Sequence, residues 1–139
     1  MQHSRGSQAR KSELTVIIKA KDLCKYIVTI TLKSPKHFRY TFTARLQNLS
    51  MDVIEHMYRA NSVFVPNNEQ KYNKYMVRLE LQRKAMADLN MLAFFAHMSF
   101  EQEAILAKQF EHISKLANEC MSLLGAWMKS DRDRFDKNI

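Results

Sequence analysis

The sequence predicts an all-α protein, an up-down-up-down antiparallel four-helix bundle, and three observations support that fold class. The 139 residues include 46% hydrophobic and 26% charged side chains but only two glycines and two prolines. This composition leaves little material for β-turns and suits long helices. Apolar residues recur at three- and four-residue intervals, which is the period of a helix. The breaks between these segments are short, and short links join antiparallel neighbours.

The first helix is expected over about 13–32, after a disordered basic arm of residues 1–12 that is polar and aperiodic. Pro35, which has the fixed φ of a first helical position, then starts a second helix over about 35–61, with Ser34 as a possible cap. The core stripe of the first helix is Val16, Ile17, Ala20, Leu23, Cys24, Ile27 and Ile30. The stripe of the second helix is Phe38, Phe42, Leu46, Leu49, Val53 and Met57.

The third helix is expected over about 68–97 and the fourth over about 99–129, so that the bundle spans 13–130 and residues 131–139 form a C-terminal tail. Ser99 and Gln102 have the spacing of a capping box, which places the start of the fourth helix at Ser99. The third stripe is Tyr72, Met76, Leu79, Met86, Leu89 and Ala93. The fourth is Leu106, Phe110, Ile113, Ala117, Cys120, Leu124 and Trp127, which has the 3.5-residue repeat of helix bundles.

The formal net charge of +8 lies in the first third of the chain. Residues 1–45 hold ten Lys and Arg against two acids, whereas the remaining residues hold twelve of each sign. A concentrated basic surface attracts nucleic acid, so phosphate contact is one interpretation of this run and a solvated face is the other. No base-reading motif is present, and any such contact would follow shape and charge. The candidate nucleic-acid-binding residues are Lys19, Lys21, Lys25, Lys33, Lys36, Arg39 and Arg45.

The first helix is also apolar on the side opposite its core stripe. An exposed apolar strip of this kind indicates a protein interface between subunits, unless a loop or the N-terminal arm covers it. Gly125 inside the fourth helix indicates a close backbone approach or a packing need. The only tryptophan follows it, as a packing residue or a subunit contact. The candidate interface residues are Leu14, Ile18, Val28, Leu32 and Trp127.

Residues for catalysis or metal binding are not suggested by any spacing. A bundle that holds a metal pair uses Glu-x-x-His on its helices, and no histidine here has Glu three places before it. A metal-dependent enzyme is therefore the weakest hypothesis, and we expect no metal, no cofactor and no catalysis. No apolar stretch reaches the roughly 18 residues of a membrane span. We expect no membrane partner, a cytoplasmic location, and reduced thiols at Cys24 and Cys120.

Several segments between Glu13 and Lys129 together resemble one known family by their order and spacing. They are Glu13-Leu14-Thr15-Val16, Ser34-Pro35-Lys36, Arg45-Leu46 with Tyr58-Arg59-Ala60-Asn61, and Leu124-Gly125-Ala126-Trp127-Met128-Lys129. They are similar to the Avd-like four-helix-bundle family, named after the accessory variability determinant of diversity-generating retroelements. The related bundles of ribosomal-RNA intervening sequences often have an Asn-Ile-Ala-Glu-Gly-like segment after the second helix, which is absent here, and this favours the Avd branch.

The resemblance implies a bacterial or phage-encoded, non-catalytic protein that assembles as a homopentameric barrel. It further implies that basic surface residues bind nucleic acid, with RNA expected, and that the protein associates with the element's reverse transcriptase during mutagenic retrohoming. The alternative function is a structural oligomerisation or protein-adaptor module without a nucleic-acid role.

Overall fold

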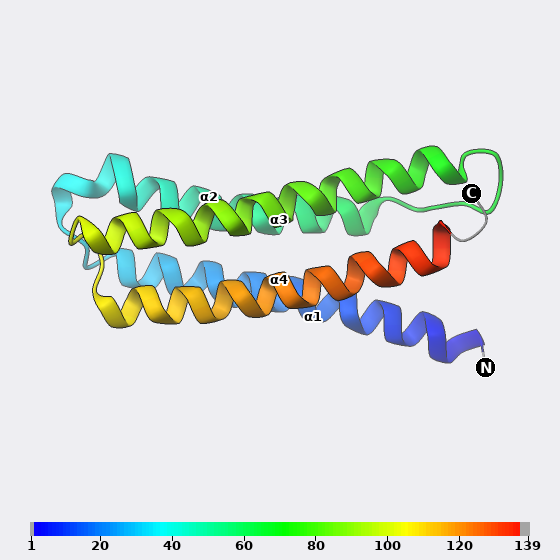
Figure 1. Ribbon diagram of the computed structural model, residues 1–139, viewed down its shortest axis with the longest axis horizontal. Helices are drawn as coiled ribbons and strands as arrows, with labels where there is room; N and C mark the ends of the chain where they lie inside the picture. Colours follow the sequence, from blue (N-terminus) through cyan, green and yellow to red (C-terminus); the bar gives the residue numbers. More distant parts are fainter. Residues whose placement is uncertain (1, 137–139) are drawn as a thin grey trace.

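The computed structural model describes residues 2–136, and the side chains of residues 15–136. All regular structure in this range is helical, in four long helices: α1 (Gln2–Thr31), α2 (Ala44–Ser62), α3 (Lys71–Glu101) and α4 (Ala107–Phe135). Each helix packs antiparallel to the next, and α4 closes the bundle against α1 (Figure 1). The predicted four-helix bundle is confirmed.

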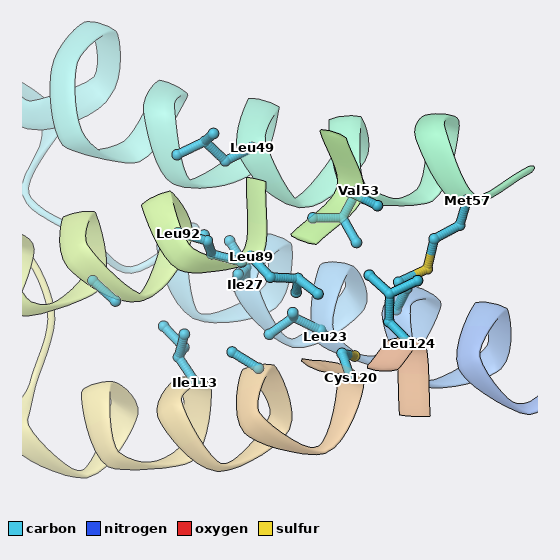
Figure 2. Close-up of a cluster of buried hydrophobic side chains, with 14 of the residues drawn as sticks. Leu23, Ile27, Leu49, Val53, Met57, Leu89, Leu92, Ile113, Cys120 and Leu124 are labelled. Atoms are coloured by element: carbon cyan, nitrogen blue, oxygen red, sulfur yellow. The ribbon is translucent and has the colours of Figure 1, made fainter. Parts of the chain in front are cut away.

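Leucine, isoleucine and valine side chains from all four helices fill the centre of the bundle (Figure 2). Leu23 of α1, Val53 of α2, Leu89 of α3 and Leu124 of α4 are all fully buried. Each such side chain contributes roughly 1.5–3 kcal/mol to folding through the removal of apolar surface from water. The predicted stripe of the fourth helix is confirmed from Ile113 to Trp127, because its 3.5-residue repeat keeps one face toward the core.

Helix α1 begins at Gln2, whereas the sequence pattern predicted a separate disordered arm over residues 1–12. The difference has a physical reason, because extending an existing helix is far easier than nucleating one. Gln, Ala, Arg and Lys, which make up most of this stretch, are also good helix formers. Residues 2–12 therefore continue the helix axis and do not fold back over the outer side of α1.

The second predicted helix, over 35–61, starts with two irregular turns. After α1 ends at Thr31, a 3₁₀ turn (η1, Lys36–Phe38) and a π-helical turn (η2, Arg39–Thr43) precede α2. Pro35 takes φ −54° and ψ 136° at the start, and no side chain caps it, so the capping role predicted for Ser34 is not found. Phe38 and Phe42, predicted as core, are half-buried and contact each other edge to face. This segment forms one end of the bundle.

The predicted fourth-helix start at Ser99 is wrong. Ser99 is buried inside α3, and its hydroxyl donates to the carbonyl oxygen of Phe95 at 2.6 Å. The chain turns later, with Glu103 at φ 64°, and α4 starts after Leu106, whose backbone N–H donates to Gln109 Oε1 at 2.8 Å. Ser99 and Gln102 have the spacing of a capping box, but Ser99 is buried inside α3 and caps no helix.

The C-terminal end of α4 also differs from the prediction. The helix continues to Phe135, so residues 131–135 belong to the bundle and not to the predicted tail. Asp131 is fully buried and faces α3. The predicted third stripe is correct at Leu89, which is fully buried, but Tyr72 is exposed and Met76 and Leu79 are half-buried. The face of α3 that points inward begins instead with a set of other residues. These are Tyr75, Arg78, Gln82 and Ala85.

Candidate functional site

The seven predicted basic residues lie on α1, in the turn that follows it, on the η1–η2 segment and on the first turn of α2. Six of them are exposed, while Lys19 is half-buried and lies 3.5 Å from Glu119 of α4. Two of the exposed lysines, Lys21 and Lys25, lie one helical turn apart on the outer side of α1. Lys33 lies two residues past the end of α1, in the turn that leads to η1. The basic strip therefore runs along α1 and ends at the η1–η2 segment.

Acidic groups do not neutralise this strip. Within the described side chains, residues 15–136, none of the other six basic residues forms an ion pair. Their positive charge is open to a partner. Asp22 lies on the same stretch of α1, while Glu101 ends α3 and Glu103 lies on the link after it, at the same end of the bundle. Glu101 lies 3.3 Å from His97 Nδ1 and so has a cationic neighbour of its own when His97 is protonated. We call the six residues the basic strip: Lys21, Lys25, Lys33, Lys36, Arg39 and Arg45.

One side of the η1–η2 segment carries a small depression of about 210 Å³. Lys36 and Arg39 line it together with hydroxyl and amide groups of neighbouring helices. Gln47 donates to the hydroxyl of Thr31 at 2.9 Å, and Thr31 donates to the carbonyl oxygen of Ile27 at 2.6 Å. These hydrogen bonds fix Thr31 and Gln47, so Lys36 and Arg39 share the depression with polar groups that are held in place.

The other side of the same segment carries a larger pocket of about 520 Å³ between η2, α2 and α3. Tyr40 lines it with 86% of its surface exposed. The guanidinium carbon of Arg45 lies 5.4 Å from the centre of the Phe95 ring, which is a cation–π distance. Sequence reasoning missed Phe95 as a site residue, because nothing local in the sequence links α3 to the basic run.

Tyr26 is interleaved with the lysines in the sequence but not in space. Its ring lies 4.4 Å from that of His112 on α4, and burial raises the pKa of its hydroxyl. Tyr26 therefore contributes to the α1–α4 contact. Among the tyrosines of the basic run, Tyr40 is the one that stands free beside the cations.

The predicted interface residues divide into three groups. Ile18 and Leu32 are exposed, at 48% and 79%, and Val28 is half-buried. The side chain of Leu14 lies outside the described residues. Since residues 2–12 continue the helix, the arm does not cover this side of α1, and one alternative to an interface is removed. Lys21 and Lys25 lie between Ile18 and Leu32 along the chain, and Leu32 is the first residue after α1.

Trp127 does not belong with these interface residues. None of its surface is exposed, and it packs inside the bundle, which confirms the packing interpretation and excludes a surface contact. Gly125, in the same segment, is not explained by close packing, since a Cβ built there meets no atom within 4 Å.

A buried polar cluster at the opposite end of the bundle was missed entirely. Arg78 donates twice to the carboxylate of Asp131, at 2.6 and 3.1 Å, and its guanidinium carbon lies 5.2 Å from the Trp127 ring centre. Gln82 and Arg134 donate to the same carboxylate at 2.9 and 2.7 Å. We call these four residues the Asp131 cluster. Its donors saturate one carboxylate in the core, which is typical of a structural role.

Burial also shifts the pKa values of a thiol and a carboxyl group. Burial raises the pKa of the Cys120 thiol to about 12, and a thiol that stays protonated is a poor nucleophile and a poor metal ligand. Burial also raises the pKa of Asp88, although His56 opposes this through a 2.6 Å hydrogen bond that joins α2 to α3. Among the residues that the structure describes, no group of three or more His, Cys, Asp or Glu side chains is placed to hold a metal ion.

The fold and this site define a helical-bundle protein with a basic, aromatic-flanked end. Over the described range, no helix is both long enough and apolar enough to pass through a lipid bilayer. No protein-family model matches the chain. No curated protein matches it either.

Proposed function

We propose that this protein is a non-catalytic nucleic-acid-binding subunit that acts as an accessory to the reverse transcriptase of a diversity-generating retroelement. The observation that supports nucleic-acid binding is the basic strip itself, six exposed cationic side chains without an ion pair among the described residues. The part of the proposal that concerns a retroelement and its reverse transcriptase rests on the resemblance of the sequence to the Avd-like family.

Phosphate is the ligand chemistry that fits the strip best. Unpaired lysine and arginine side chains release counterions from a nucleic-acid backbone when they bind it, and this term supplies most sequence-independent affinity. The strip presents no arrangement for reading base edges in a duplex groove. The protein is therefore expected to hold RNA by its backbone, as an accessory subunit that leaves base selection to its partner.

The outer face of α1 also supports a protein partner. Exposed Ile18 on the helix and exposed Leu32 just past its end flank Lys21 and Lys25 along the chain. Apolar side chains with lysine stems at their rim are typical of protein contacts. We propose that this face mediates two contacts. One is self-association, as the homopentamer that the resemblance implies, and the other is contact with reverse transcriptase.

The test of nucleic-acid binding is a charge reversal with a matched control. The variant Lys21→Glu/Lys25→Glu/Arg39→Glu changes the strip, and Lys74→Glu/Lys84→Glu/Lys115→Glu changes the net charge equally at exposed positions on α3 and α4. The strip variant is expected to lose roughly tenfold or more in RNA affinity at low salt. It should also show a salt slope shallower by about 2 on a log–log plot, at ~0.7 for each lost phosphate contact. Fluorescence anisotropy against salt concentration measures both.

Equal losses in both variants would show that net charge alone drives binding, and salt-insensitive or absent binding by the wild type would refute the proposal. An adaptor without a nucleic-acid role is the second candidate, favoured by the exposed Ile18 and Leu32. It would keep its oligomer and its protein partner in the strip variant and show no retention on immobilised RNA. Co-purification with a reverse transcriptase encoded beside the gene tests the partner directly.

A further inference from the structure

We infer that the pocket between η2, α2 and α3 takes an unpaired base of a single-stranded nucleic acid, stacked on Tyr40 while the neighbouring phosphates lie on the basic strip. This inference rests on the proposed function and adds to it the strandedness of the ligand. A duplex has no free base for the pocket and would contact the basic strip alone.

The size and position of the pocket fit a nucleobase that is turned outward from its strand. Its volume of about 520 Å³ lies within the range of small-molecule sites. The η1–η2 segment separates it from the depression that holds Lys36 and Arg39. A strand that crosses this segment can therefore place phosphates on one side and a base on the other.

The chemistry of the walls suits a nucleobase. Tyr40 is 86% exposed, so its ring has a face available for stacking, and every base has a π-face that can stack on it. The guanidinium of Arg45 already lies over the Phe95 ring, and a planar guanidinium also stacks on bases. Asn48 supplies an amide that both donates and accepts hydrogen bonds at the pocket edge.

Charge and strandedness point the same way. The described residues that line the pocket include Arg45 and no acidic side chain, so the lining itself presents no negative charge to repel a strand. In a duplex the bases are stacked inside the helix and unavailable, whereas single strands can turn a base out onto an aromatic side chain. A solvent-exposed tyrosine beside unpaired cations is the combination that single-strand binders use.

The experiment compares a fluorescein-labelled 12-nucleotide oligouridine RNA with a 12-base-pair RNA duplex, at low salt. Tyr40→Ala is expected to lower single-strand affinity roughly tenfold, the order of one lost stacking contact, and to change duplex affinity less than twofold. Tyr40→Phe keeps the ring and should restore binding. Tyr58→Ala is the matched control, because Tyr58 is an exposed tyrosine further along α2 and should have no effect.

A base reporter gives a second reading that a structural role of Tyr40 would not change. An oligonucleotide with one 2-aminopurine should lose fluorescence on binding to the wild type and to Tyr40→Phe, and should keep it with Tyr40→Ala at saturating protein. If the strip reversal weakens binding but Tyr40→Ala changes neither affinity nor quenching, this inference is wrong and the proposed function stands. If the wild type binds neither RNA, both are wrong. A tenfold loss for the duplex as well would also overturn the preference for single strands.

Discussion

Each end of the bundle has an arginine beside an aromatic ring, but one arginine is exposed and the other is buried in an ion pair. Arg45, beside η2, is exposed over Phe95 and has no ion pair in the described chain. Arg78, at the other end, is buried over Trp127 and bound to Asp131 at 2.6 Å. A cation that has lost its water must be compensated inside the fold, whereas a cation in water is free to meet a partner. One end is therefore built for stability and the other for binding.

The largest effect is expected at the Asp131 cluster. Asp131→Ala leaves the buried guanidinium of Arg78 without its carboxylate, and breaking a buried pair in this way costs about 3–5 kcal/mol. Urea unfolding followed by circular dichroism measures the loss. Asp133→Ala is the control, an exposed aspartate two residues along the same helix, and should stay within ~0.5 kcal/mol of the wild type. A similar cost for both variants would contradict the division between the two ends.

The second effect is the recovery of stability when the whole cluster becomes apolar. Arg78→Met/Gln82→Leu/Asp131→Leu removes the charges together. It also removes Gln82 Oε1, which has no hydrogen-bond partner among the described residues. Replacing buried ion pairs with apolar residues of similar size is often neutral or stabilising. The triple variant should therefore recover at least half of the loss measured for Asp131→Ala. A triple variant less stable than Asp131→Ala would mean that packing cannot replace the cluster.

These two ends were not equally predictable from the sequence. The basic strip could be identified because its residues are neighbours in the chain, and the helices and most of the core followed from apolar periodicity. The Asp131 cluster could not, because Arg78 and Gln82 are polar residues at core positions. Their partner also lies beyond the predicted end of the fourth helix. Periodicity assigns polar residues to the surface, so the third stripe was correct at Leu89 but ran through Met76 and Leu79, one position away from buried Tyr75 and Arg78.

The pocket shows the same limit at the binding end. Tyr40 and Arg45 were visible in the sequence, but the wall that makes them a pocket comes from Phe95 on α3. Which residue of a distant helix lies opposite depends on the rotation of that helix about its axis. The misplaced third stripe left that rotation wrong, and the contact could be found only in the folded structure.

A smaller effect of opposite sign is expected at Gly125, in α4 near the Asp131 cluster. A glycine inside a helix costs about 1 kcal/mol relative to alanine, and a Cβ at this position meets no atom within 4 Å. Gly125→Ala should therefore raise the free energy of unfolding by about 0.5–1 kcal/mol, measured by urea unfolding. Ala126→Gly, at the exposed neighbouring position, should lower it by a similar amount. If Gly125→Ala is destabilising only at high protein concentration, a second molecule occupies that space.

The smallest effect on stability is expected at the binding end, where it separates binding from folding. Arg39→Ala removes an exposed side chain without an ion pair among the described residues, and such surface changes usually stay within about 0.5 kcal/mol. The same variant should lower RNA affinity at low salt, since one phosphate contact is lost. Urea unfolding and anisotropy on one protein preparation measure both quantities. A loss of stability above ~1 kcal/mol would show that Arg39 supports the η1–η2 segment, and the contrast with Arg78 would then be one of degree.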